Sequence, residues 1–292
     1  MIHSLRRRAR FVGVGIATLG LGVTGIVAGV SAPASAVARG VQPHPTVGPP
    51  PLDHFLCYNV KATGFGPIVG VLLKNFIQPQ LFQPRVGNVA THCNPATKTV
   101  QLAAGGTITY KVKNPNAHLL CWNITYKFQS VPVNISNQFG KAIMMTSPGP
   151  KSLCLPTWKK RSGPPRKTPV QPPRLDHFTC YGLTVIKGQY GFTIPPSVRA
   201  QDEFSFPGST QLKLGVADKL CVPTTKVYKN KVFAPQGQND LSLVCFPSSK
   251  TPYWKSFWDQ NQFGTGKVFP TKPTIATTPF EELCLPSTAI IG

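Results

Sequence analysis

One series of short motifs occurs twice along this chain, in the same order. The repeated pairs are LDHFLCY at residues 52–58 and LDHFTCY at 175–181, NQFG at 137–140 and 261–264, and LCLP at 153–156 and 283–286. Three motifs repeated in one order at a nearly constant offset indicate a duplicated unit. The fold must therefore accommodate two related copies, and chemistry that both copies share should appear in both.

The first 36 residues read as an export signal. Arginines precede an uncharged apolar stretch over residues 11–30, and residues 34–36 (ASA) form a small-residue cleavage site. Cleavage after Ala36 or Ala38 is equally consistent, and an uncleaved anchor is the alternative, because twenty apolar residues can span a bilayer. No later apolar run is long enough to cross a membrane, so we expect a secreted or cell-envelope-associated protein.

All eight cysteines follow the leader, four in each copy. They are Cys57, Cys93, Cys121, Cys154, Cys180, Cys221, Cys245 and Cys284. An even number in an exported chain predicts disulfides. A zinc site fits poorly because the chain has no Cys-x-x-Cys pair, so we expect neither a metal nor another cofactor.

A finer repeat suggests how the cysteines pair. Cys57-Tyr58-Asn59-Val60 resembles Cys121-Trp122-Asn123-Ile124, and the Cys-x-Pro-x-x-Lys segment at residues 93–98 returns at 154–159. Each copy thus looks like two half-repeats that open with an aromatic-flanked cysteine and close with Cys-x-Pro. One bridge per half-repeat gives the pairs Cys57–Cys93, Cys121–Cys154, Cys180–Cys221 and Cys245–Cys284, among 105 possible pairings.

Proline-rich residues 37–51 and 160–174 read as a spacer and a basic linker. They delimit two units, residues 52–159 and 175–288. Short runs rich in Val, Ile, Thr and aromatics alternate with Gly, Pro and Asn, and no amphipathic helix is evident. We therefore predict an all-β protein of two tandem duplicated, disulfide-bonded domains, each a β-sandwich or β-barrel. Pro247 lacks a ladder donor, so we expect its strand to be broken or at an edge.

The order DHFxCY, CxPxxK, NQFG, LCLP resembles an uncharacterised family of exported bacterial Cys-rich repeat domains. The resemblance covers nearly all of residues 52–288. It implies extracellular placement and a disulfide-bearing β module, and it implies no activity.

The doubled motifs do not indicate catalysis. In Asp53-His54 and Asp176-His177 the two side chains point to opposite faces of a strand, so we expect Asp to bond a turn and His to be half-buried. NQFG predicts a strand that turns at glycine with its phenylalanine in the core. Asp53 is the only acid in the first copy, whereas glycoside hydrolysis needs two carboxylates. We therefore predict a protein that is not an enzyme.

Two alternatives stay open. One is a secreted hydrolase whose site in the second copy would use His177 or a pair from its acids, namely Asp202, Glu203, Asp218, Asp240, Glu281 and Glu282. The other is an exported adhesin or inhibitor that binds a protein partner.

Charge separates the two copies. Residues 37–168 carry 15 basic and one acidic residue, and residues 169–292 carry 12 and eight. A field this one-sided attracts polyanions, so we expect an anionic envelope polymer or acidic polysaccharide as partner, and no nucleic-acid-binding motif is present. Nothing in the sequence indicates an oligomeric state. The predicted electrostatic footprint comprises Lys61, Lys74, Arg85, Lys111, Lys113, Lys127, Lys141, Lys159, Lys160 and Arg161.

Overall fold

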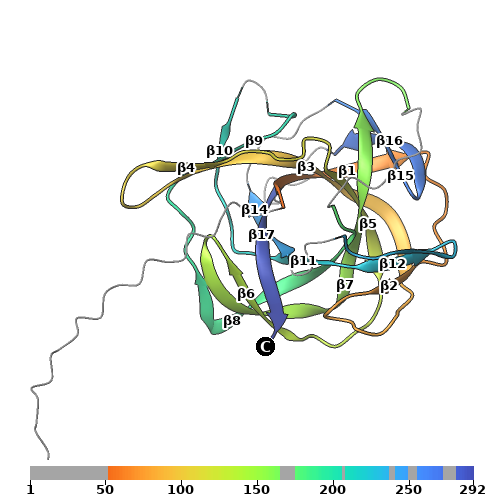
Figure 1. The fold of residues 1–292 in the computed structure, drawn as a ribbon, viewed down its shortest axis with the longest axis horizontal. Coiled ribbons are helices and arrows are strands. Elements are labelled where there is room, and N and C mark those ends of the chain that lie inside the picture. The colour runs from red at the N-terminus through yellow and green to blue at the C-terminus, as the bar shows by residue number, and fades with distance from the viewer. Residues whose placement is uncertain (1–51, 165–174, 206–207, 237–240, 249–254, 272–280) are drawn as a thin grey trace, which may run out of the picture. The chain divides into compact units, whose positions relative to one another are not determined.

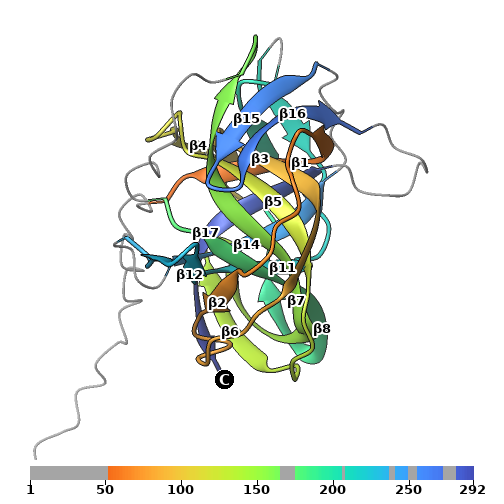
Figure 2. The ribbon, with the colours of Figure 1, turned by 90° about the vertical axis from the view of Figure 1, so that its right-hand side faces the viewer.

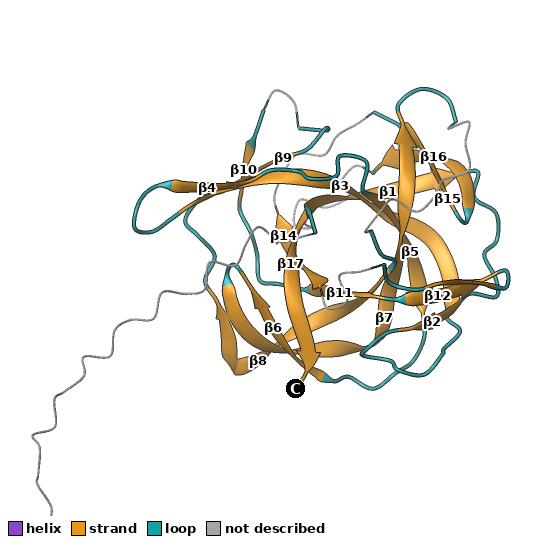
Figure 3. Ribbon diagram, in the orientation of Figure 1, coloured by secondary structure: helices purple, strands orange, loops and turns teal. Residues whose placement is uncertain are grey.

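A computed structural model describes residues 52–164, 175–205, 208–236, 241–248, 255–271 and 281–292. The predicted signal peptide and spacer, and most of the linker, lie outside these residues. The described residues contain strands and no helix, which confirms the all-β prediction (Figure 3). The strands are β1 (His54–Thr63), β2 (Leu72–Lys74), β3 (Arg85–Gln101), β4 (Thr107–Tyr110), β5 (His118–Thr125), β6 (Pro132–Asn137), β7 (Gly140–Lys160), β8 (Phe178–Phe192), β9 (Val198–Gln201), β10 (Thr210–Leu212), β11 (Lys219–Pro223), β12 (Thr225–Tyr228), β13 (Lys231–Phe233), β14 (Leu241–Ser248), β15 (Phe257–Asn261), β16 (Gly264–Pro270) and β17 (Glu281–Ile291).

Eight strands close into one antiparallel barrel. The order β1-β3-β5-β7-β8-β11-β14-β17 is hydrogen-bonded at each step, and β17 pairs back with β1 (Figure 1). Closure leaves no strand of this ring with an unpaired edge at that level.

The barrel strands are buried on both faces. Along β1, Phe55 and Cys57 belong to an inner cluster that contains all eight cysteines, whereas Leu56, Tyr58 and Val60 belong to an outer hydrophobic cluster. This alternation follows from the two-residue period of a strand. The inner cluster fills the barrel, and a second layer of strands covers the outer cluster.

The second layer repeats four times. The far ends of the barrel strands β3, β7 and β17 pair outside the barrel with β9, β15 and β6, and β12, which follows the barrel strand β11, pairs with β2 in the same way. The registers are equivalent: Lys98 faces Ala200, Lys159 faces Asp259, Lys226 faces Leu73, and Ala289 faces Ile135. The β15–β16 hairpin also lies beside β1 (Figure 2). Each half-repeat thus contributes two strands to the barrel and one strand pairing to the second layer.

The two copies in the sequence share this one barrel. β1 of the first copy pairs with β16 and β17 of the second, and β7 pairs with β8 across the linker. The described residues, from 52 onward, form one compact unit. In the sequence the first copy ends at residue 159 and the second begins at residue 175. In the structure both copies contribute strands to the same barrel.

Pro247 does not break its strand, contrary to our prediction. β14 lies between β11 and β17, and Pro247 pairs with Glu282 of β17. On the other side, the β11 ladder ends at Cys245, and the Pro247 carbonyl accepts a hydrogen bond from Gly215 N instead. The missing N–H is tolerated because the neighbouring ladder has already ended.

Candidate functional site

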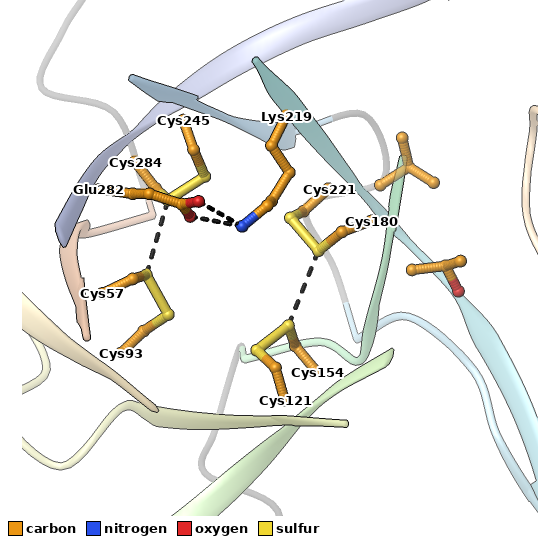
Figure 4. Close-up of a disulfide and its surroundings, with 12 residues drawn as sticks. Cys57, Cys93, Cys121, Cys154, Cys180, Lys219, Cys221, Cys245, Glu282 and Cys284 are labelled. Carbon is orange, nitrogen blue, oxygen red and sulfur yellow. Dashed lines mark hydrogen bonds and ion pairs between the residues drawn. A yellow bond between two sulfur atoms is a disulfide. The ribbon is translucent and has the colours of Figure 1, made fainter. Parts of the chain in front are cut away.

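Four disulfides line the inside of the barrel (Figure 4). They join Cys57–Cys93, Cys121–Cys154, Cys180–Cys221 and Cys245–Cys284, which confirms one bridge per half-repeat. Neighbouring bridges approach closely, with Cys57 Sγ 3.6 Å from Cys284 Sγ and Cys154 Sγ 3.7 Å from Cys180 Sγ. The bridges lie side by side because each joins directly opposed residues at one level of the barrel.

The barrel interior is not a ligand site. Its cavity measures about 20 Å³, which is room for about one water molecule. Lys219 Nζ reaches into it and donates to both Glu282 oxygens at 2.5 and 2.6 Å (Figure 4). Cys245 and Cys284 lie near Glu282, but both are in a disulfide, so only one potential metal ligand is left there.

The doubled motifs meet around buried lysines in the outer layer. In the second copy, Lys226 of Cys-x-Pro-x-x-Lys contacts Gln262 of NQFG, and His177 Nε2 lies 3.0 Å from Gln262 Oε1. The Lys226 Nζ lies 4.7 Å from the Phe233 ring centroid and 4.8 Å from that of Phe263. Two aromatic rings thus lie where a carboxylate would usually accompany a buried lysine, and they can contact its ammonium through cation–π interactions.

The first copy has the equivalent pocket. Lys98 Nζ lies 4.6 Å from the Tyr110 ring centroid and 5.0 Å from that of Phe139. His54 Nε2 lies 2.9 Å from the side-chain nitrogen of Gln138. Lys98 and Lys226 are both fully buried. The last half-repeat carries Ala289 at this position, so it lacks the lysine.

The aspartates and phenylalanines have the structural roles that we predicted. His54 and His177, which we expected to be half-buried, are buried, because an aromatic ring and a glutamine contact each of them. Asp53 accepts hydrogen bonds from Lys113 N and Asn114 N, and Asp176 accepts one from Gln236 N. Phe139 and Phe263 are buried, and the glycines that follow them have positive φ. The side chain of Gln138 bonds a histidine rather than the backbone, which the sequence alone did not indicate.

Burial lowers the pKa of Lys226 from 10.5 to about 7. Between these values the unfolded chain binds more protons than the folded one, so the free energy of unfolding rises with pH. We expect a rise of about 1 kcal/mol per pH unit from this lysine between pH 7.5 and 9. Lys226→Met should remove that slope in denaturant titrations, and the exposed Lys231→Met should keep it. Equal slopes in the two variants would contradict the shift.

The second half-repeat builds a different pocket from the same positions. His118 takes the place of His54, and Asp202-Glu203-Phe204 takes the place of Asn137-Gln138-Phe139; Asp202 Oδ1 accepts from Phe204 N as Asn137 Oδ1 accepts from Phe139 N. Lys159 Nζ forms an ion pair with Glu203 and lies 4.1 Å from the Phe204 ring centroid. The pocket therefore contains a carboxylate where the others have an amide.

Three more polar residues enter this pocket at positions that are apolar elsewhere. His92 and Asn94 flank Cys93, where the other half-repeats carry leucine or valine, and Asp259 stands where they carry Ala200, Leu73 and Ile135. His92, Asn94 and Asp259 are fully buried. We define the Lys159 cluster as Tyr58, His92, Asn94, His118, Lys159, Asp202, Glu203 and Asp259.

Asn94 lies at the centre of the Lys159 cluster. Its Oδ1 faces Lys159 Nζ at 2.8 Å, His92 Nε2 at 2.9 Å and His118 Nδ1 at 3.1 Å. Its Nδ2 donates to Asp202 Oδ2 at 3.0 Å, which fixes the orientation of the amide because a carboxylate accepts.

Outer contacts hold these groups in place. His92 Nδ1 lies 2.8 Å from Asp259 Oδ2, and Tyr58 OH donates to Asp202 Oδ2 at 2.7 Å. Burial lowers the pKa of Lys159 to about 7, although Asp259 and Asp202 raise it, and burial lowers the pKa of His118 well below its usual range. Near neutral pH the Lys159 amine and the His118 imidazole can thus both be uncharged.

Sequence reasoning missed most of this cluster. It sought features shared by both copies, whereas His92, Asn94 and Asp259 occur at one of four equivalent places. An alignment of the half-repeats could have found it, because it aligns His118 with His54 and residues 202–204 (DEF) with residues 137–139 (NQF).

The predicted basic footprint does not form one surface. Nine of its ten side chains belong to exposed residues, but Lys159 was assigned wrongly: its side chain is 3% exposed because the second layer covers it. Lys61 and Arg85 share one groove, Lys111 and Lys113 line a smaller hollow beside Asp53, and Lys141 lies at a third place.

The groove of Lys61 and Arg85 has a volume of about 1230 Å³. It runs over the outer face of β1, β3 and β5, where two register shifts in β3 interrupt its ladder with β5. Exposed Asn59, Asn88 and Asn123 line it. None of the described residues that line it is acidic.

The described candidate acids of a hydrolase lie in two separate places. Asp202 and Glu203 belong to the Lys159 cluster, and Glu282 lies inside the barrel with Lys219. Burial, with Glu282 nearby, raises the pKa of Asp218 to about 6. Asp240 lies outside the described residues.

Fold and sites together define a disulfide-bridged, closed all-β module with buried lysine pockets. No family model, curated protein or solved structure matches the chain. The resemblance inferred from motif order therefore stays a prediction. In the described part of the chain, no helix is long and apolar enough to cross a membrane.

Proposed function

We propose that this protein is an exported, non-catalytic binding module of the bacterial cell envelope whose outer groove takes an anionic polymer. The observation that carries the proposal is the lining of the groove, where Lys61 and Arg85 accompany three exposed asparagines and no described acid. Cations attract phosphate or carboxylate groups of a polymer, and amides can bond hydroxyl and carbonyl groups along it.

The charge distribution supports the same function. The first copy supplies 15 basic residues against one acid, and both cationic residues of the groove come from it. A polyanion would therefore be attracted to the first copy, which also carries the cationic residues of the groove. Four buried bridges suit an oxidising compartment outside the cytoplasm.

The lining of the groove also argues against hydrolysis there. Glycoside hydrolysis usually requires a pair of carboxylates on either side of the scissile bond. The described residues of the groove supply none.

Retention of the whole exported chain on purified bacterial wall tests the proposal. We expect binding that weakens between 50 and 500 mM salt, about the range over which screening shortens from near 14 to near 4 Å. It should also require the anionic polymers of the wall.

Lys61→Gln combined with Arg85→Gln should weaken retention about tenfold, which corresponds to about 1.4 kcal/mol. Lys74→Gln combined with Lys141→Gln removes the same charge away from the groove and serves as the matched control. Equal losses in the two double variants would mean that net charge, and not the groove, causes binding. No retention of the wild type would contradict the proposed function.

A further inference from the structure

Two reactive groups of the Lys159 cluster, the Lys159 amine and the Asn94 amide, are buried, whereas the Glu203 side chain is 33% exposed. Asn94, His92 and Asp259 are fully buried, and none of the cluster residues lines the outer groove or the barrel cavity. The reactants in direct contact with the buried Lys159 amine are therefore side chains of the protein itself.

The contacts around Asn94 suit an attack on its amide carbon. A carbonyl oxygen has two lone pairs, yet three potential donors converge on Asn94 Oδ1. A tetrahedral oxyanion has one lone pair more, so this arrangement matches the intermediate better than the resting amide. The donor nearest to Oδ1 is the amine of Lys159, at 2.8 Å.

We propose that Lys159 and Asn94 form an intramolecular isopeptide bond. The Lys159 amine attacks Asn94 Cγ, the new Nζ–Cγ bond forms, and the Cγ–Nδ2 bond breaks. One primary amine and one primary amide become one secondary amide and one ammonia, without an oxidant or reductant.

The neighbouring side chains have distinct parts in this step. Glu203, which contacts Lys159 Nζ, accepts the proton that the ammonium must lose before attack. His92 and His118 lie within hydrogen-bond reach of the developing oxyanion. Asp202 lies 3.0 Å from the leaving nitrogen and relays to it the second proton, which Lys159 Nζ loses as the new bond forms, so that the nitrogen departs as ammonia. Phe204 and Phe257 border the amine and keep water from competing.

The other lysine pockets lack this constellation. Lys98 Nζ has no hydrogen-bond partner among the described residues, and Leu155, from the half-repeat that precedes Lys226, occupies the position of Asn94 near that lysine. The proposal therefore concerns one of three buried lysines, and the other two provide internal controls.

The bond would join β3 to β7 across the outer layer, since Asn94 and Lys159 belong to these strands. Disulfide reduction would leave it intact. The protein would then carry one cross-link that is independent of redox conditions beside four that depend on them.

Intact-mass measurement of the whole exported protein after full reduction is the test. We expect a mass lower by one ammonia than the sequence requires, and a cross-linked peptide containing Lys159 and Asn94 in tandem spectra. Lys159→Met and Asn94→Leu should each restore the full mass, whereas Lys226→Met should keep the deficit.

A second variant separates reaction from folding. His92→Leu combined with Asp259→Leu leaves both reacting groups in place and inserts leucines, which stand at the equivalent positions as Leu153 and Leu73, so that no buried carboxylate loses its partner. It should fold with four bridges but show a lower cross-linked fraction early after synthesis. Folded, fully bridged wild type with no mass deficit would overturn the proposal. So would a deficit of one water mapped to Lys159 and Glu203, because that bond would join a different pair.

Discussion

Removal of the Cys121–Cys154 bridge is expected to lower the free energy of unfolding by about 4 kcal/mol. The bridge closes a loop of 33 residues, and the chain-entropy model gives about 3.5–4 kcal/mol for a loop of this size. The double variant Cys121→Ala, Cys154→Ala removes both sulfurs from the interior and leaves two methyl groups there. Urea unfolding of the oxidised protein measures the loss, and a change below about 1 kcal/mol would contradict it.

The single variant Cys121→Ala is the informative companion. It leaves the Cys154 thiol 3.7 Å from Cys180 Sγ, the distance at which these sulfurs now lie. A thiolate at that place can attack the Cys180–Cys221 bridge, so non-reducing peptide maps should reveal a Cys154–Cys180 pair. The double variant should show only the three native bridges that remain.

Asp259→Leu is expected to lower the free energy of unfolding by about 3–5 kcal/mol, the usual penalty for removing one partner of a buried ion pair. Asp259 Oδ2 is 2.8 Å from His92 Nδ1, and both side chains are fully buried. Without the carboxylate, the imidazole keeps a buried nitrogen that has lost its partner, and Lys159 loses a charge that favours its ammonium.

The repeat itself supplies the matched control. Leucine stands at the position of His92 in three half-repeats, and Leu73 stands at the position of Asp259 in the first. The double variant His92→Leu, Asp259→Leu should therefore recover much of the loss, with a coupling of at least about 1 kcal/mol in thermal or urea unfolding. Additive effects would show that the two residues do not act as a pair.

The sequence predicted those parts of the fold that local repetition encodes. Strand character followed from composition, and the bridges followed from the half-repeat, because Cys57 resembles Cys121 and Cys93 resembles Cys154. These inferences need only the chain within one half-repeat, so they did not depend on how the copies meet.

Pairing between the copies could not be predicted in the same way. No local pattern indicates that Phe55 faces Cys284 or that Lys98 faces Ala200, since these pairs are far apart in sequence. The Lys159 cluster depends on such pairing, because Asn94 belongs to the first copy and Asp202 to the second. Asp202 and Glu203, which the sequence suggested only as candidate acids of a hydrolase, are therefore neighbours of a buried lysine.

The seam between β1 and β17 has a consequence for how the protein reaches its folded state. Phe55 and Cys284 are 229 positions apart in the sequence, so the barrel cannot close until the chain has been synthesised as far as β17. Until then β1 exposes an unpaired edge, which invites association with other chains. Contacts this distant in sequence also fold slowly. The incomplete polypeptide should consequently need protection by a chaperone until β17 is available to pair with β1.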